Sequence, residues 1–236
     1  METLKKESFF ILAALVVTTT CCAQSADEIV ARNLQAVGGK DLIASTKSVV
    51  ITSNLEVMGN DVPTTTTILA GKGFKSETDF QGTKIIQVVT DHGGWGVNPM
   101  AGQATPTALS DADAKKGQNQ LNIVPLADYT ANGGKLELVG KDTADYKVKL
   151  TNANGFDATY YINMKTYLLD KVDAHVSAQG QEVDVTGLFS DYRKLDNGLL
   201  IPFKLERQLP QYSLVITHQK VEVNKDIDPA IFEMPK

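Results

Sequence analysis

Three histidines are the side chains of this chain best suited to metal binding or acid–base chemistry: His92, His175 and His218. Their spacing contains no His-x-His or His-x-x-x-His pair, the arrangements that place two imidazoles on one metal ion. His92 follows Asp91 in the turn "DHGG", where an aspartate is ordinary turn chemistry. His175 and His218 fall within strand patterns, so we expect solvated or hydrogen-bonded rings. The histidines therefore indicate neither a metal site nor a catalytic dyad.

Other sequence motifs that mark catalysis are missing. The chain has no G-x-S-x-G nucleophile elbow, no phosphate-binding P-loop and no G-x-G-x-x-G dinucleotide fingerprint. The carboxylates Asp111 and Asp113 follow Ser110, an order typical of a helix N-terminus. We therefore expect a protein that is not an enzyme and that uses no cofactor and no metal. The catalytic alternative is a site assembled from polar residues on distant strands, which leaves no linear motif.

The N-terminal segment 1–23 differs in composition from the rest of the chain. Two lysines precede the apolar run "FFILAALVV", and small residues follow it, which is the pattern of a secretory signal peptide. As a helix the run would rise only about 14 Å, against a bilayer core of roughly 30 Å. We expect cleavage after Ala23, leaving a single domain over 24–236. The alternative is lipid attachment at Cys21 or Cys22, although lipoprotein signals usually place Gly, Ala or Ser before that cysteine.

Composition narrows the class of partner. Cleavage after Ala23 would remove both cysteines, so the mature chain would hold no disulfide and no cysteine-ligated metal. The net charge is −5 and no basic run is present, which argues against nucleic acid. The remaining 213 residues (236 minus 23) suit one all-β domain, which we expect to be a monomer.

The segment 25–39 predicts a helix. Ser25 and Glu28 have the spacing of a capping box, and apolar residues then recur with helical spacing as far as Val37. Gly38 and Gly39 end the pattern, because glycine adopts the left-handed conformation of a C-cap without steric cost.

From Lys47 to Asn224 the apolar residues instead alternate with polar ones, as in "DYKVKLTN" and "LLIPFKLERQ". We predict a mainly β (α+β) fold: an incomplete antiparallel β-barrel of about eleven strands, with the N-terminal helix and a central helical insert that begins at Ser110. A sheet of this size with one apolar face curls. It encloses a hydrophobic cavity unless the helices fill the space.

Aromatic residues on the apolar strand faces are the candidates for lining this cavity. The alternative for each is ordinary core packing. Trp95 lies in "VVTDHGGWGVNPMAG", which we interpret as a strand, a tight turn and a second strand, so that its glycines are turn residues. The candidate ligand-binding residues are Phe80, Trp95, Tyr160, Phe189 and Phe203.

Three stretches carry a resemblance to a known family. They are the helix "ADEIVARNLQAVGGKDLI", the hairpin "DHGGWGVNP", and the C-terminal "FSDYRKLDNGLLIPFKLE" followed by "ITHQKVEVNKDIDPAIFEMP". Together they resemble the periplasmic lipoprotein carriers of the LolA/LolB-like superfamily, over nearly the whole mature chain. The resemblance implies an incomplete barrel of about eleven strands whose helices form a lid over a hydrophobic cavity. In the best-known members that cavity takes lipoprotein acyl chains across the periplasm.

One departure limits what the resemblance implies. The established carrier holds its lid with an arginine on an early strand, and "KSVVITSNLEV" and "TTTTILAGKGF" contain none. Arg193 and Arg207 lie late in the chain and do not match that position, so no family ligand-binding residue is carried over. We expect an exported periplasmic protein of a Gram-negative type envelope that binds lipid or acyl chains. The alternative is a lipid-anchored outer-membrane lipoprotein that uses the same sheet to bind an envelope protein partner.

Overall fold

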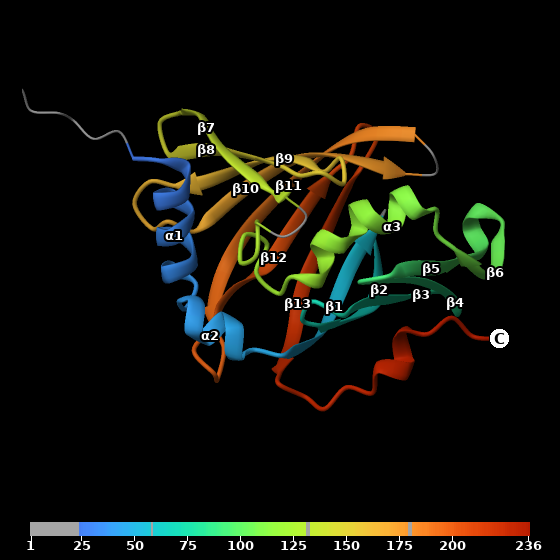
Figure 1. Cartoon of the computed structure of the whole chain (residues 1–236). Coiled ribbons are helices and arrows are strands. Elements are labelled where there is room, and N and C mark those ends of the chain that lie inside the picture. Colours follow the sequence, from blue (N-terminus) through green and yellow to red (C-terminus); the bar gives the residue numbers. More distant parts are fainter. Residues whose placement is uncertain (1–23, 58, 131–132, 179–180) are drawn as a thin grey trace, which may run out of the picture.

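The structure is a computed structural model that describes residues 24–57, 59–130, 133–178 and 181–236, so the predicted signal peptide lies outside the described residues. Its thirteen strands form one sheet in which every neighbouring pair is antiparallel (Figure 1). The first half of the sheet holds β1 (Ser48–Val57), β2 (Asn60–Leu69), β3 (Gly73–Phe80), β4 (Thr83–Thr90), β5 (Gly93–Asn98) and β6 (Gln103–Ala108). The second half holds β7 (Lys135–Lys141), β8 (Asp145–Thr151), β9 (Asp157–Asn163), β10 (Leu169–Ala178), β11 (Gln181–Lys194), β12 (Leu200–Gln208) and β13 (Ser213–Val223).

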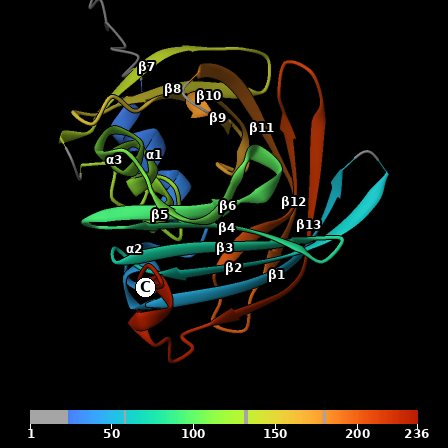
Figure 2. The same ribbon diagram turned by 90° about the vertical axis from the view of Figure 1, so that its right-hand side faces the viewer.

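The chain enters this sheet at its middle. β1 to β6 step outward to one edge, a helical segment crosses to the other edge, and β7 to β13 step back until β13 pairs with β1. The sheet curls around its helices, as Figure 2 shows, and in the described part of the chain β6 and β7 stay unpaired as its two edges. The sheet is therefore open and is not closed into a barrel.

The expectation of a mainly β, antiparallel fold is confirmed, but the predicted number of strands is wrong. The described residues form thirteen strands, not about eleven. The edge strand β6 is exposed at every position, so its sequence "QATPTA" has no apolar alternation to reveal it.

The N-terminal helix α1 (Ala26–Ala36) begins with the predicted capping box. The Glu28 amide donates to Ser25 Oγ at 3.2 Å, and the Ser25 amide donates to the Glu28 carboxylate at 3.1 Å. The buried stripe that includes Ile29 and Leu34 packs against strand residues such as Val148 and Tyr160 in the main core. A short helix, α2 (Lys40–Ser45), follows and leads into β1.

The central insert also begins where the sequence predicts. Ser110 Oγ accepts a hydrogen bond from the Asp113 amide at 3.1 Å and caps α3 (Asp111–Gly117), which the 3₁₀ helix η2 (Gln118–Leu121) continues. Another 3₁₀ turn, η1 (Pro99–Ala101), joins β5 to β6. Beyond η2 the chain buries Val124 and Leu126 in the same core as α1. Figure 2 places α1 and α3 on the inner side of the curl, which we call the concave face.

The opposite, convex face of β3 to β5 is covered by the C-terminal segment, which contains the 3₁₀ helix η4 (Pro229–Phe232). There Val88, Trp95 and Phe232 form a second buried cluster, separate from the main core. The Trp95 indole N–H donates to the Phe232 carbonyl at 2.9 Å. The Phe232 ring lies so close to Gly73 that a Cβ there would approach it to 2.7 Å. A glycine on β3 is therefore what lets this ring reach the sheet.

Candidate functional site: a hydrophobic cavity

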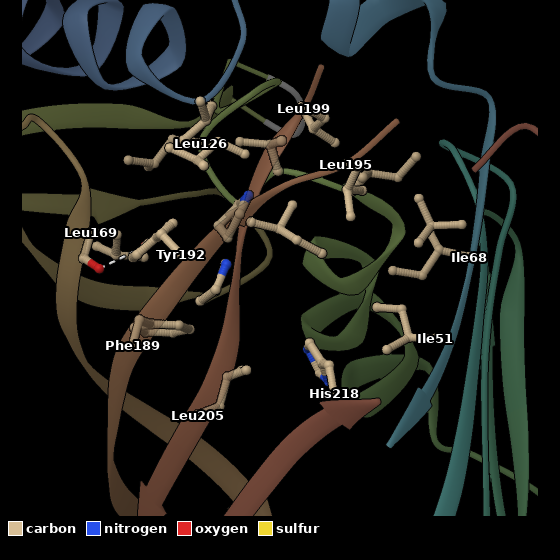
Figure 3. Close-up of a pocket in the computed structure, with 18 of the residues that line it drawn as sticks. Ile51, Ile68, Leu126, Leu169, Phe189, Tyr192, Leu195, Leu199, Leu205 and His218 are labelled. Carbon is tan, nitrogen blue, oxygen red and sulfur yellow. Dashed lines mark hydrogen bonds between the residues drawn. The ribbon is translucent and has the colours of Figure 1, made fainter. Parts of the chain in front are cut away.

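A cavity of about 200 Å³ opens on the concave face, between the sheet, α1 and the insert (Figure 3). The strands supply most of its wall, and α1, the segment after η2 and the turn between β11 and β12 supply the rest. Figure 3 shows Phe189, Leu205 and His218 from neighbouring strands together with Leu126 from the insert. The lining residues are Asn33, Val37, Val49, Ile51, Ile68, Ile123, Val124, Pro125, Leu126, Leu169, Phe189, Tyr192, Leu195, Leu199, Leu200, Ile201, Pro202, Leu205 and His218.

Strand alternation explains why this wall is apolar. Successive side chains of a strand point to opposite faces, so residues two apart share a face. Val49 and Ile51 on β1 both line the cavity, and Ile68 on β2 pairs directly with Val49. On the other side of the cavity Leu205 of β12 pairs with Phe189 of β11.

The few polar side chains of the lining already have partners within the protein. Asn33 donates to the Tyr167 carbonyl at 2.7 Å, and the Tyr192 hydroxyl donates to the Leu169 carbonyl at 2.7 Å. Burial raises the pKa of Tyr192 above its ordinary value, so its hydroxyl stays neutral.

His218 is the one lining residue that titrates near physiological pH when it is free. Its Nδ1 lies 2.9 Å from Ser53 Oγ, and burial lowers the pKa of the imidazole to about 4. The ring is therefore neutral at pH 7, and the cavity wall carries no formal charge.

Such a wall favours binding of apolar groups over catalysis. An apolar cavity of about 150 Å³ can stay dry and take up benzene, so about 200 Å³ lined in the same way has room for an apolar guest. Ser53 and His218 form a hydroxyl–imidazole pair, but among the described residues no carboxylate forms an ion pair with the His218 ring, as a catalytic triad would require. Among the described residues no three His, Cys, Asp or Glu side chains are grouped to hold a metal.

The other two histidines lie at the surface. His92 and His175 are exposed, and each pairs with one aspartate, Asp91 and Asp184 respectively. The predictions that His92 lies in a turn, and that His175 and His218 are solvated or hydrogen-bonded strand residues, are confirmed.

The structure places the five candidate aromatic residues in different surroundings. Phe189 is in the cavity wall. Tyr160 is buried beneath α1 in the main core, and Phe80 is half-buried at the end of β3. Phe203 is buried beside the wall, with its ring edge-on to His218 at 6.1 Å between centroids and the Arg193 guanidinium 4.6 Å from its centre.

Trp95, the fifth candidate, lies on the convex face. Cross-strand pairs connect it in a single row through Val88, Lys75 and Thr67 to Val50. Val50 stands between the cavity residues 49 and 51 on β1, so this whole row points away from the cavity. Trp95 instead anchors the C-terminal segment to the sheet.

Several lining residues were not among the sequence candidates. The run "NIVPL" after the insert contributes Ile123 to Leu126, and the turn before β12 contributes Leu195 and Leu199. An apolar run directly after a capped helix was the available signal for the first group. In the second group, Leu195 lies outside the alternating run "LLIPFKLERQ", and for Leu199 alternation predicts a face but not what that face meets.

Comparison with solved structures identifies the fold. A LolA superfamily protein from Nitrosomonas europaea superposes with a TM-score of 0.60 at 11% identity, over 89% of this chain and 98% of that chain. A DUF1329 family protein from Desulfovibrio piger superposes with a TM-score of 0.57 at 14% identity, over 89% of this chain and 98% of that chain. A domain named for outer membrane lipoprotein sorting, from Vibrio parahaemolyticus, superposes with a TM-score of 0.55 at 13% identity, over 87% of this chain and 94% of that chain.

By sequence alone, no model of a known family matches the chain, and no curated protein matches it either. None of the described helices has the length and apolar composition needed to span a membrane. The predicted resemblance is confirmed at the level of the fold: the chain has a LolA/LolB-like fold.

Proposed function

We propose that this protein binds an apolar ligand, a lipid or the acyl chains of a lipoprotein, in the cavity of its concave face and carries it without chemical change. The observation that carries the proposal is the cavity itself, about 200 Å³ with an apolar wall whose polar groups are already hydrogen-bonded. Removal of acyl chains from water supplies the driving force. Each buried methylene contributes about 0.8 kcal/mol, so six of them contribute about 5 kcal/mol.

In this proposal α1 and the insert act as the lid. Both contribute to the cavity wall, through Asn33 of α1, Val37 at its C-terminal cap, and Leu126 of the insert, so movement of either would open the cavity. We place the carrier in the periplasm, in accordance with the expected signal peptide over 1–23. The likeness to a domain named for lipoprotein sorting supports this location and this ligand class.

The first test is whether filling the cavity abolishes uptake of a neutral apolar dye, 1-N-phenylnaphthylamine, followed by its fluorescence. Leu205→Trp places a larger side chain in the cavity wall. Exclusion of even two methylene equivalents costs about 1.6 kcal/mol, which is more than a tenfold loss of affinity. The matched control is Val215→Trp, on the adjacent strand β13. Val215 is half-buried like Leu205, but it alternates with Ile216, which pairs with Leu205, so it points to the convex face.

We expect the wild-type protein and Val215→Trp to bind the dye equally and Leu205→Trp to bind at least tenfold more weakly, at similar melting temperatures. Equal binding by the two variants would refute the cavity as the binding site. Native mass spectrometry of protein purified from bacterial envelopes identifies the cargo as a mass lost on denaturation. The denatured mass also distinguishes an unmodified Gln24 from a lipidated cysteine, which would favour the anchored alternative.

A further inference from the structure

A single charged residue interrupts an otherwise uncharged row on the concave face. Cross-strand pairs connect Tyr160 of β9, Val172 of β10, Gly187 of β11, Arg207 of β12 and Leu214 of β13. Four of these five residues are apolar, aromatic or glycine. A guanidinium in such a row requires an explanation, because a cation next to apolar protein surface loses part of its hydration.

Two observations place Arg207 on the same face as the cavity. Leu205, two residues earlier on the same strand, lines the cavity, and no irregularity of register separates them. Gly187, which pairs with Arg207, faces the same way as the cavity residue Phe189, since a Cβ on Gly187 would lie 3.5 Å from that ring.

Arg207 has no partner among the side chains that the structure describes. The other arginines do: Arg32 donates to the Tyr167 hydroxyl at 2.9 Å, and Arg193 forms an ion pair with Asp191 at 2.6 Å. Arg207 is exposed to solvent, and desolvation by the protein around it lowers the pKa of its guanidinium. An arginine stays protonated in such a site.

We propose that Arg207 binds the anionic head of the ligand whose acyl chain occupies the cavity. The inference rests on the proposed function and narrows its ligand class to amphiphiles with a carboxylate or phosphate head. Guanidinium matches both groups, because its planar fork donates two parallel hydrogen bonds to paired oxygens.

The order of residues along β12 agrees with a ligand whose acyl chain lies in the cavity and whose head lies at Arg207. The strand follows the fully buried cavity residue Leu199, passes Leu205 in the cavity wall, and reaches Arg207 one residue before its end at Gln208. Two residues of strand separate the Cα atoms of Leu205 and Arg207 by about 7 Å. An acyl chain in the cavity with its head at Arg207 therefore has its apolar end in the closed part and its charge in the part that water reaches.

The test compares three probes with the same chain and different heads: dodecanoate, dodecyl phosphate and dodecanol, titrated at pH 8 by calorimetry below their micelle concentrations. The variant is Arg207→Gln. The matched control is Lys204→Gln, which removes the same charge from an exposed residue of the same strand. Lys204 lies next to Leu205 and so points to the opposite face.

We expect the wild-type protein to bind at least one of the two anions about tenfold more tightly than dodecanol, the factor that one charge-assisted hydrogen bond provides. Arg207→Gln should remove this preference and leave dodecanol binding unchanged, while Lys204→Gln should change neither. The two anionic probes show whether the site prefers carboxylate or phosphate. Equal thermal melting of the two variants confirms that both are folded.

Three results would overturn the inference. If dodecanol binds as tightly as the anions, the cavity takes acyl chains and no head-group site exists. If Lys204→Gln weakens anion binding as much as Arg207→Gln does, the effect is general electrostatic attraction. If none of the three probes binds, the proposed function itself fails, and the head-group site fails with it.

Discussion

Replacing Phe232 with alanine tests whether the two faces of the sheet work independently. Phe232 is only 5% exposed, lies against Gly73, and packs with Trp95 and Val88 on the convex face. Phe→Ala substitutions in protein cores cost about 3–5 kcal/mol, through lost burial and the cavity left behind. The hydrogen bond from the Trp95 indole would persist, because its acceptor is the backbone carbonyl of residue 232. We therefore expect a loss near the lower end, about 3 kcal/mol in the free energy of unfolding.

Trp95 provides the readout, because it is the only tryptophan of the chain and contacts the substituted residue. Urea unfolding followed by tryptophan fluorescence should give a lower midpoint for Phe232→Ala, and the folded variant should show a red-shifted emission as water reaches the indole. Binding of 1-N-phenylnaphthylamine in the absence of urea should equal that of the wild type. The reasoning fails if stability changes by less than about 0.5 kcal/mol, or if dye binding falls while stability does not.

Three further substitutions test local features. Ser25→Ala removes the capping box of α1 and should cost about 1 kcal/mol in urea unfolding, whereas a change near zero would mean that packing alone holds the helix. Burial lowers the pKa of His218 to about 4 from about 6.5 in the unfolded chain. The unfolded state therefore binds more protons, and stability falls as pH drops from 6.5 to 4. His218→Gln should weaken the pH dependence of the urea unfolding midpoint over this range. Desolvation, followed by the charges of Asp170 and Asp142, raises the pKa of Asp145 to about 6. The folded state then binds more protons and stability falls as pH rises from about 4 to 6, so Asp145→Asn should raise the melting temperature at pH 7 but not at pH 4.

Features that depend on a short segment were predictable from the sequence. The capping box at Ser25, the helix start at Ser110 and the hairpin around His92 each depend on contacts between residues a few positions apart. Alternation predicts that Tyr160 and Tyr161 lie on opposite faces of their strand, and in the structure Tyr160 is buried whereas the Lys171 ammonium lies 4.0 Å from the ring centre of Tyr161. Alternation alone decides such pairs, since it needs no knowledge of distant strands.

The features that the sequence left open depend on distant partners. Alternation shows that Trp95 has an apolar side, but that side faces the C-terminal segment, 137 residues away along the chain, and not the cavity. Nothing local distinguishes these two partners, because both are apolar. Arg207 illustrates the same limit for a charge: alternation places it on the same face as Leu205, but the sequence does not show that this face lines a cavity or that Gly187 lies opposite Arg207.

The polarity of the concave face itself favours a particular path for a bound chain. On β2 and β3 the concave positions next to the cavity carry hydroxyl groups: Thr66 pairs with Ser76, and Thr64 pairs with Thr78, with their two hydroxyl oxygens 3.1 Å apart. An acyl chain laid over these groups would remove them from water without giving them new hydrogen bonds, which is unfavourable. Along β11 and β12 the wall is apolar, so a chain placed there has no such cost. Arg207 lies on this side of the cavity. One amphiphile could therefore place its apolar chain against the apolar wall and its charged head at Arg207 along the same strand.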